Sequence, residues 1–529
     1  MHRIFSRRAY SYIAAGFFIG TFIDHAPYAC AQEPRAASVV ELQQRVQDLE
    51  AVVRQLKEGR DANPALTQPV SMVSGDSTPP PAPTAATVAN ASSDPADPTV
   101  GGGATGAAEN FIGWNNGFFL QSPDRSCQLR ITGQIQGDYR GFLDPVDSSS
   151  TANSAVAGSP ITGSPDTFLV RRARLGIEAT MANYYEFRLL PDFAGSTVAK
   201  SITDAYMNVH YWDALQFEIG KFKQPFSYED LIQDRYVPTM ERSMMDQLCP
   251  QRDEGAMIHG ERLFCGRFDY AVAVSNGDPN DSTIDDNNSK DVNARAVLRP
   301  FEELNGCGLL NGFQIGIAGS FGVENDAVST TSSTPPTITT PATVTWFAYN
   351  SGVLANGVRH RISPELVYFY HSFGFASQFY HQDQKLQASA TKPIVDVPID
   401  GYYVMATYLL TGEQRHEYSQ QIEPLSPFDP TAPIASPGAW ELVFRVDRME
   451  VGPEAFSGRT PLASETGTTN RPSPEALEET TGVNWYLTKW SRAQLNWEHA
   501  NFASPIKIGN MSKPLSGEDA LYTRFQVIF

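Results

Sequence analysis

Residues 168–180, FLVRRARLGIEAT, alternate between apolar and charged side chains. The odd positions are apolar apart from Arg171, and the even positions carry Arg172, Arg174 and Glu178. A period of two residues is typical of a β-strand and not of a helix, which has about 3.6 residues per turn. Residues 185–193, YEFRLLPDF, repeat the pattern after the short connection 181–184. The two runs therefore predict a β-hairpin with one charged and one apolar face.

The same alternation recurs along the rest of the chain, at 204–210, 215–219, 268–275, 440–447, 492–498 and 521–529. A soluble β-sandwich also alternates, so the pattern alone does not decide between a sandwich and a barrel. Three further features favour a membrane barrel with a hydrated lumen. The polar face is charged in many strands, and short connections alternate with long polar ones at 144–166, 276–291, 321–344, 412–438 and 455–478. The apolar face is framed by aromatic residues, namely Tyr184, Tyr185, Tyr211, Trp212, Trp485 and Trp497.

The predicted fold class is all-β, a transmembrane antiparallel β-barrel over residues 109–529. At roughly 25 residues for each strand with its share of loop, this length accommodates about 16 strands. A short coiled-coil helix and a disordered linker are expected to precede the barrel.

Three segments precede the barrel. Residues 1–31 combine a basic start, the apolar run 13–23 and the small-x-small sequence at 29–31, which predicts a secretory signal peptide. Residues 32–58 place Val and Leu at heptad spacing, which predicts a coiled-coil oligomerisation helix. Residues 59–108 are rich in Pro, Gly and Ala and lack aromatic residues, which predicts a disordered linker.

The chain carries a formal net charge of −19, which argues against nucleic-acid binding because phosphate neutralisation needs a clustered basic surface. The sequence contains no G-x-S-x-G, H-E-x-x-H or Walker A motif, and its histidines lack metal-ligand spacing. We therefore expect neither an enzyme nor a metal or other cofactor.

Several motifs together resemble the phosphate-selective porin O and P family. They are VRRARLGIEATMANYYEFRLLPDF, FEIGKFKQPFSYED, MERSMMDQL, GYYVMATYLLTGEQR, GAWELVFRVDRMEV and NWYLTKWSRAQLNWEHANF, in order over residues 168–529. The resemblance implies a 16-stranded, trimeric outer-membrane barrel that passes small solutes, with phosphate-type anions as the named substrate.

Arginine suits anion selection because its planar fork donates two hydrogen bonds to an oxyanion. Strand parity predicts that a set of arginines faces the lumen: Arg172, Arg174, Arg188, Arg295, Arg299, Arg445, Arg492 and Arg524. The alternative is that these residues only form ion pairs with neighbouring carboxylates and keep the wall rigid.

The stretch 221–267 is expected to join two strands and to contain the constriction loop, because porins fold a long early loop inward. Its candidate solute-binding residues are Lys223, Arg235, Arg242 and Arg252. An extracellular loop at the trimer contact is the alternative. Four cysteines, Cys127, Cys249, Cys265 and Cys307, are disulfide candidates with three possible connectivities, and a Cys249–Cys265 bond would fix the loop.

The predicted function is passive diffusion of small hydrophilic solutes across the outer membrane, with a preference for anions such as phosphate. The alternatives are a weakly selective general porin, and a barrel anchor whose coiled coil tethers the outer membrane to the cell wall. The expected partners are outer-membrane lipid, two further copies of the chain in a homotrimer, and the permeating solutes. The N-terminal coiled coil and linker are expected in the periplasm.

Overall fold

The computed structural model describes residues 111–114, 117–143, 166–194, 202–277, 289–302, 308–325, 335–467, 470–508 and 513–529. The signal peptide, coiled coil and linker predicted for residues 1–108 lie outside the described residues.

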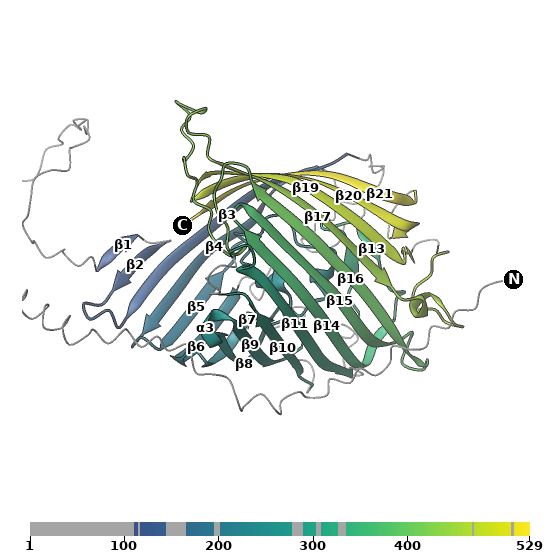
Figure 1. Cartoon of the computed structure of the whole chain (residues 1–529). Coiled ribbons are helices and arrows are strands. Elements are labelled where there is room, and N and C mark those ends of the chain that lie inside the picture. Colours follow the sequence, from purple (N-terminus) through teal and green to yellow (C-terminus); the bar gives the residue numbers. More distant parts are fainter. Residues whose placement is uncertain are drawn as a thin grey trace, which may run out of the picture. The chain divides into compact units, whose positions relative to one another are not determined.

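Sixteen antiparallel strands form one closed barrel (Figure 1). They are β3 (Gln128–Phe142), β4 (Thr167–Met181), β5 (Tyr185–Pro191), β6 (Ile202–Trp212), β7 (Leu215–Lys223), β8 (Arg252–Arg262), β9 (Phe268–Ser275), β10 (Asp291–Leu298), β11 (Gly312–Asn325), β14 (Leu354–Tyr370), β15 (Phe373–Gln387), β16 (Ile394–Leu409), β17 (Ala439–Val451), β19 (Glu475–Thr488), β20 (Ser491–Ile508) and β21 (Leu515–Ile528). Each strand pairs with the next, and β21 closes the ring on β3, from Ala520 opposite Phe142 to Ile528 opposite Gln134. The predicted barrel and its strand number are confirmed.

The remaining elements are short. The hairpin β1 (Ile112–Trp114) and β2 (Phe118–Gln121) pairs with the first residues of β3, and β18 (Asn470–Arg471) pairs with β20. A separate hairpin consists of β12 (Ile338–Thr339) and β13 (Thr345–Phe347). The described helices are α2 (Tyr228–Leu231), η3 (Met244–Leu248), α3 (Leu263–Gly266) and η4 (Pro453–Phe456). None of these described helices has the length and hydropathy needed to cross a membrane.

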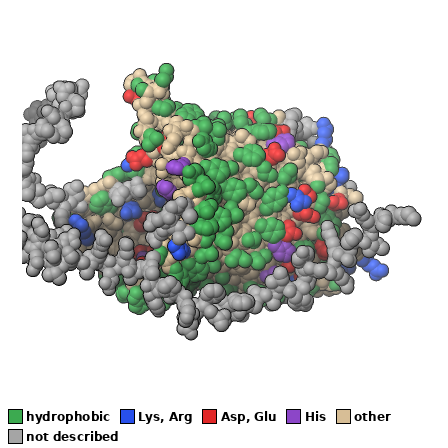
Figure 2. All heavy atoms as spheres, in the orientation of Figure 1, with side chains coloured by type: hydrophobic (Ala, Val, Ile, Leu, Met, Phe, Trp, Pro, Cys, Tyr) green, Lys and Arg blue, Asp and Glu red, His purple; other side chains and the backbone are tan. Residues whose placement is uncertain are grey.

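The two faces of the wall differ in polarity, as the alternation predicts. Outward-facing side chains such as Ile258, Ile317 and Phe444 are exposed, whereas Arg445, Glu478 and Glu498 on the inner face are buried. Figure 2 shows a band of hydrophobic side chains across the middle of the visible wall, with charged and histidine side chains on either side. An apolar outer band and a polar interior are the arrangement that a membrane barrel requires.

A β-bulge in β4 explains the one charged residue on its predicted apolar face. Opposite β4, Gln136 pairs with Arg172 and Gly137 pairs with Val170, so Arg171 has no partner in the ladder. A bulge lets consecutive residues break the alternation. Arg171 therefore turns inward, and the outward positions before it become Phe168 and Val170. The assignment of Leu169 to the outer face was wrong for this reason.

The barrel has a turn end and a loop end. The turn end holds the connections 182–184, 213–214, 263–267, 371–372, 410–438 and 489–490, together with the C-terminal residue Phe529. The loop end holds the connections 224–251 and 388–393. The long connection 410–438 thus lies with the short turns, contrary to the predicted alternation. It carries buried Arg415 and Tyr418, which pack into the barrel mouth: Arg415 pairs with Glu441 at 2.8 Å.

Two loop-end connections fold into the barrel. The inward loop (residues 224–251) buries Phe226 and Met244 against the inner faces of β14 to β17. The segment 335–353 buries Trp346 and Phe347 in the same apolar cluster, and its strand β13 contacts β20. Apolar burial of this kind fills one side of the lumen. Open space along the inward loop remains on the side of β3 to β8.

Candidate functional site: a charged constriction

The inward loop contains two short helices, α2 and η3, which shape its backbone. Ser227 caps α2 by accepting a hydrogen bond from the Asp230 amide at 3.2 Å, and Ser243 precedes η3. The stretch predicted as one connection, 221–267, is in fact divided, because residues 252–262 form strand β8. The sequence did not reveal this because glycine and charged residues interrupt the alternation there.

The loop is attached to the opposite wall by arginines that were predicted to face the lumen. Arg445 is fully buried and donates to the Glu241 carbonyl at 2.8 Å while pairing with Asp447 at 3.0 Å. Arg492 donates to the Val237 carbonyl at 3.1 Å. Arg524 donates to the Met240 carbonyl at 2.7 Å. These guanidiniums face inward, as predicted, but they donate hydrogen bonds to backbone carbonyls of the inward loop.

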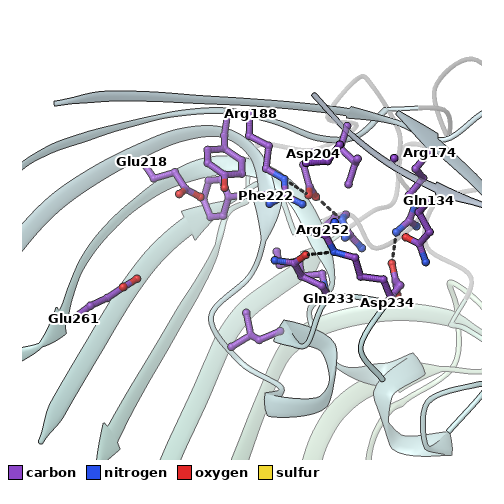
Figure 3. Close-up of a pocket in the computed structure, with 17 residues that line it drawn as sticks. Gln134, Arg174, Arg188, Asp204, Glu218, Phe222, Gln233, Asp234, Arg252 and Glu261 are labelled. Atoms are coloured by element: carbon purple, nitrogen blue, oxygen red, sulfur yellow. Dashed lines mark hydrogen bonds and ion pairs between the residues drawn. The ribbon is translucent and has the colours of Figure 1, made fainter. Parts of the chain in front are cut away.

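Two cavities lie on either side of the loop. The turn-side cavity, of about 350 Å³, is bounded by the inward loop and strands β3 to β8 (Figure 3). The loop-side cavity, of about 340 Å³, lies above the same loop and is also lined by Thr339 and Thr340 of the second inward segment. Both cavities are lined by Arg174, Asp234 and Arg252. These three residues therefore mark the division between the two halves of the open space.

The cavities are lined by charges of both signs. The basic residues are Arg171, Arg172, Arg174, Arg188, Lys223, Arg235, Arg242 and Arg252. The acidic residues are Asp204, Glu218, Asp230, Asp234, Glu241, Asp246 and Glu261. Most of the cations are matched by a carboxylate. Arg252 pairs with Asp204 at 2.6 Å, and Arg188 pairs with the same carboxylate at 3.1 Å.

Among the loop candidates, Lys223 and Arg242 have structural contacts of their own. The Lys223 ammonium donates to the carbonyls of Asp230 and Ile232, the latter at 2.9 Å. Arg242 donates to the Glu229 and Ile232 carbonyls at 3.0 and 2.9 Å. Both residues thus close the turn that follows α2, in addition to lining a cavity.

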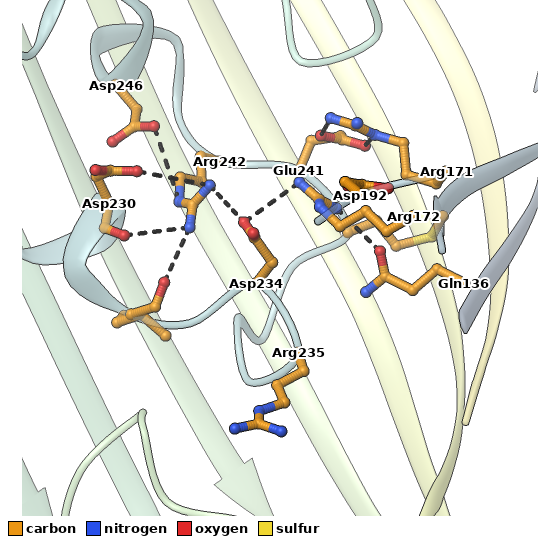
Figure 4. Close-up of polar contacts among 12 residues, drawn as sticks. Gln136, Arg171, Arg172, Asp192, Asp230, Asp234, Arg235, Glu241, Arg242 and Asp246 are labelled. Atoms are coloured by element: carbon orange, nitrogen blue, oxygen red, sulfur yellow. Dashed lines mark hydrogen bonds and ion pairs between the residues drawn. The ribbon is translucent and has the colours of Figure 1, made fainter. Parts of the chain in front are cut away.

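The candidate Arg235 is different. Its Nε donates to the Gln233 Oε1 atom at 2.9 Å, and its guanidinium lies 5.0 Å from the centre of the Tyr236 ring. Among the described residues, no carboxylate forms an ion pair with it. Figure 4 shows the Arg235 guanidinium pointing away from the cluster of charged residues around Asp234.

Two further arginines lie on the barrel wall: Arg295, which was predicted to face the lumen, and Arg171, which was not. Arg295 pairs with Glu365, with 3.2 Å between Nε and Oε2, and lines neither of the two cavities. Arg171, which the parity rule assigned to lipid, binds the Glu241 carboxylate with two hydrogen bonds of 2.9 and 3.0 Å. The signal was in the sequence, because a lone charge on a lipid face is costly and indicates a bulge.

Titration of the loop carboxylates is set by burial and by charged neighbours. Burial, with Asp230 and Glu229 nearby, raises the pKa of Asp246 to about 8. Burial opposes ionisation of Asp234 too, but Arg172, Arg174 and Arg242 outweigh it and hold the pKa of Asp234 well below its usual range. At neutral pH the Asp246 carboxyl is mostly neutral, whereas Asp234 is ionised.

The predicted Cys249–Cys265 disulfide is wrong. Cys127 and Cys249 are free thiols, and Cys265 is disulfide-bonded to a partner outside the described residues. Cys249 is buried at the end of the inward loop, whereas Cys265 lies in the turn after β8, at the other end of the barrel. A strand of this length spans roughly 35 Å, and a disulfide needs Cα atoms within about 7 Å.

A family model described as "Phosphate-selective porin O and P" matches residues 159–502, well over half of the chain. The chain belongs to the phosphate-selective porin O and P family. The family resemblance read from the sequence is thereby confirmed, and the chain is an outer-membrane porin, a channel and not an enzyme.

Solved structures similar to this porin include OmpT of Vibrio cholerae, at 10% identity and a TM-score of 0.45, covering 78% of this chain and 99% of that one. The outer membrane channel DcaP of Acinetobacter baumannii gives the same identity, TM-score and coverage. OprB of Pseudomonas putida follows at 10% identity and a TM-score of 0.43, covering 76% of this chain and 94% of that one. No curated protein sequence matches this porin.

Proposed function

We propose that this porin passes small anions, phosphate among them, in preference to cations, along the β3 to β8 side of the inward loop. The two cavities beside the loop are lined by eight basic and seven acidic residues. A pore responds to the field at its narrowest part, and the chain total of −19 does not set that field.

The observation that carries the proposal is Arg235. It is the one basic residue of the turn-side cavity that forms no ion pair among the described residues, since Arg174, Arg188, Lys223 and Arg252 each have a carboxylate within 4.0 Å. An unpaired guanidinium in a partly dehydrated channel attracts anions and repels cations. Its planar fork suits an oxyanion better than it suits chloride.

Reversal potentials of the purified porin in planar bilayers under a KCl gradient test this proposal. For the wild-type channel we expect a reversal potential with the sign of an anion-selective channel. For Arg235→Gln we expect a marked decrease in anion preference. Arg262→Gln is the control, because the Arg262 side chain is 70% exposed at the turn end and lines neither cavity. A cation-selective sign for the wild-type channel would overturn the proposal.

Phosphate is tested separately by adding it to channels that carry chloride. We expect concentration-dependent inhibition of the chloride current that weakens in Arg235→Gln. Equal currents with and without phosphate would favour the alternative, a weakly selective general porin.

The same proposal includes a homotrimer with the N-terminal region in the periplasm. The β1–β2 hairpin pairs with β3 at residues 128–131, so the chain enters the barrel at the turn end. Short turns are the periplasmic side of bacterial outer-membrane barrels. Valine and leucine at heptad spacing within residues 32–58 supply a seam for association of chains held together by the barrels.

A further inference from the structure

One carboxylate in the channel is surrounded by three guanidiniums. Asp234 lies on the inward loop between α2 and η3 and has a relative exposure of only 5%. Its Oδ1 lies 3.3 Å from Arg172 Nη2 and 2.8 Å from Arg242 Nη1, and its Oδ2 accepts a hydrogen bond from Arg174 Nη1. Figure 4 shows Arg242 on one side of the carboxylate and Arg172 on the other.

The three arginines come from two parts of the fold. Arg172 and Arg174 lie on the inner face of β4, because they are two residues apart on one strand. Arg242 comes from the inward loop itself. The Asp234 carboxylate therefore joins the loop to this wall by charge, as the Glu241 carboxylate does through Arg171.

The surroundings do not neutralise the trio without Asp234. Arg174 has a second partner in Asp192 at 2.8 Å, and Arg242 has more distant contacts with Asp230 and Asp246, each at 3.8 Å. Within the described residues, the side chain of Arg172 has only Gln136 as a further hydrogen-bond partner, at 3.0 Å. The Nε of Arg172 is buried and makes no hydrogen bond in the described part of the chain. The cluster thus retains an unused donor.

The position of the cluster makes it relevant to permeation. Asp234 lines both the turn-side and the loop-side cavity, and Arg174 does the same. A solute that moves from one cavity to the other along these shared residues passes this carboxylate and its arginines. Three guanidiniums around a point between two cavities form an oxyanion site by chemistry alone.

We propose that Asp234 is an anion built into the channel, which occupies an oxyanion site formed by Arg172, Arg174 and Arg242 and exchanges with permeating oxyanions. The inference rests on the proposed anion preference and adds the residue that determines how tightly oxyanions are held. A channel must bind its solute weakly enough to release it. Without a competing carboxylate, three desolvated guanidiniums would hold phosphate tightly and block the pore.

The test is phosphate inhibition of chloride current through the full-length porin. Asp234→Asn keeps the shape of the side chain and removes its charge. We expect the phosphate concentration for half-inhibition to fall at least about tenfold, the effect of losing one charge-assisted competitor. Adding Arg172→Gln to Asp234→Asn should reverse most of that change.

Glu261→Gln is the matched control. It also removes one negative charge from the lining of the turn-side cavity, but the Glu261 side chain is 65% exposed and lies near His259 rather than an arginine. We expect phosphate inhibition within about twofold of the wild type for this variant. A tenfold gain in both variants would show a general field effect and overturn the exchange mechanism.

Two outcomes separate this inference from the proposed function. If the wild type is anion-selective but Asp234→Asn binds phosphate no more tightly, the inference fails and the proposed function stands. If the wild type is cation-selective but Asp234→Asn is blocked by low phosphate, the oxyanion site stands and the proposed preference fails. Should Asp234→Asn not fold, Arg172→Gln in the wild-type background is expected to weaken phosphate inhibition, and unchanged inhibition would contradict the inference.

Discussion

Replacing Arg445 by glutamine should loosen the inward loop. Arg445 is fully buried on β17 and pairs with Asp447 at 3.0 Å, Glu478 at 3.3 Å and Glu229 of the loop at 3.4 Å. It also donates to the Glu241 carbonyl at 2.8 Å. Glutamine loses the positive charge and cannot reach all of these acceptors.

The magnitude follows from the charges that remain. Removing one partner of a buried ion pair costs about 3–5 kcal/mol, because the other partner is left buried and uncompensated. At about 1.4 kcal/mol for each factor of ten, a cost of about 3–5 kcal/mol raises the population of channels with a detached loop roughly 10²- to 4 × 10³-fold. The apolar contacts of Phe226 and Met244 still favour the docked loop, so we expect brief excursions and not permanent loss of the constriction.

Single-channel recording measures these excursions directly. We expect Arg445→Gln to show frequent transitions to a larger conductance with reduced anion preference. Arg448→Gln is the matched control on the same strand, because Arg448 faces outward and pairs with Glu475 at 2.7 Å. Equal conductance and equal current noise in the two variants would refute the idea that Arg445 holds the loop.

Three further predictions concern other parts of the molecule. Raising the pH from 7 to 9 ionises Asp246, whose pKa is raised to about 8, and adds a negative charge beside Arg242; anion preference measured by reversal potential should fall, and should fall less in Asp246→Asn, whereas equal falls would contradict this role of Asp246. A maleimide added to the folded porin should label exposed Cys127 and leave buried Cys249 unmodified, and mass spectrometry of the peptides would show any labelling of Cys249. Deleting residues 32–58 should lower the temperature at which oligomers dissociate on gel electrophoresis while leaving conductance unchanged; unaltered dissociation would count against the coiled coil.

Much of the barrel was predictable because the membrane imposes a simple rule on each strand. Side chains must alternate between lipid and water, and the thirteen residues 168–180 show this alternation. The sequence shows where the alternation breaks, but it does not show the structure that results from the break. Arg171 breaks the alternation, yet only the pairing of β4 with β3 shows that a bulge turns it inward to Glu241.

The candidate site was harder to predict because lumen-facing arginines have two different uses. Parity places Arg172 and Arg445 on the same inner face, and the structure then separates them. Arg172 borders the open loop-side cavity, whereas Arg445 is covered by the inward loop. The difference depends on where a distant segment folds, and neighbouring residues in the sequence do not carry that information.

The sequence by itself determined the class of the protein, a porin barrel with a charged interior, because strand periodicity and lipid contact are local requirements. Only the tertiary structure decided which charges meet. Asp234 is separated from Arg172 and Arg174 by about 60 residues of chain and lies beside them because apolar residues of the inward loop pack against the far wall. The free energy of that packing, gained at one side of the lumen, places the carboxylate among the arginines on the other.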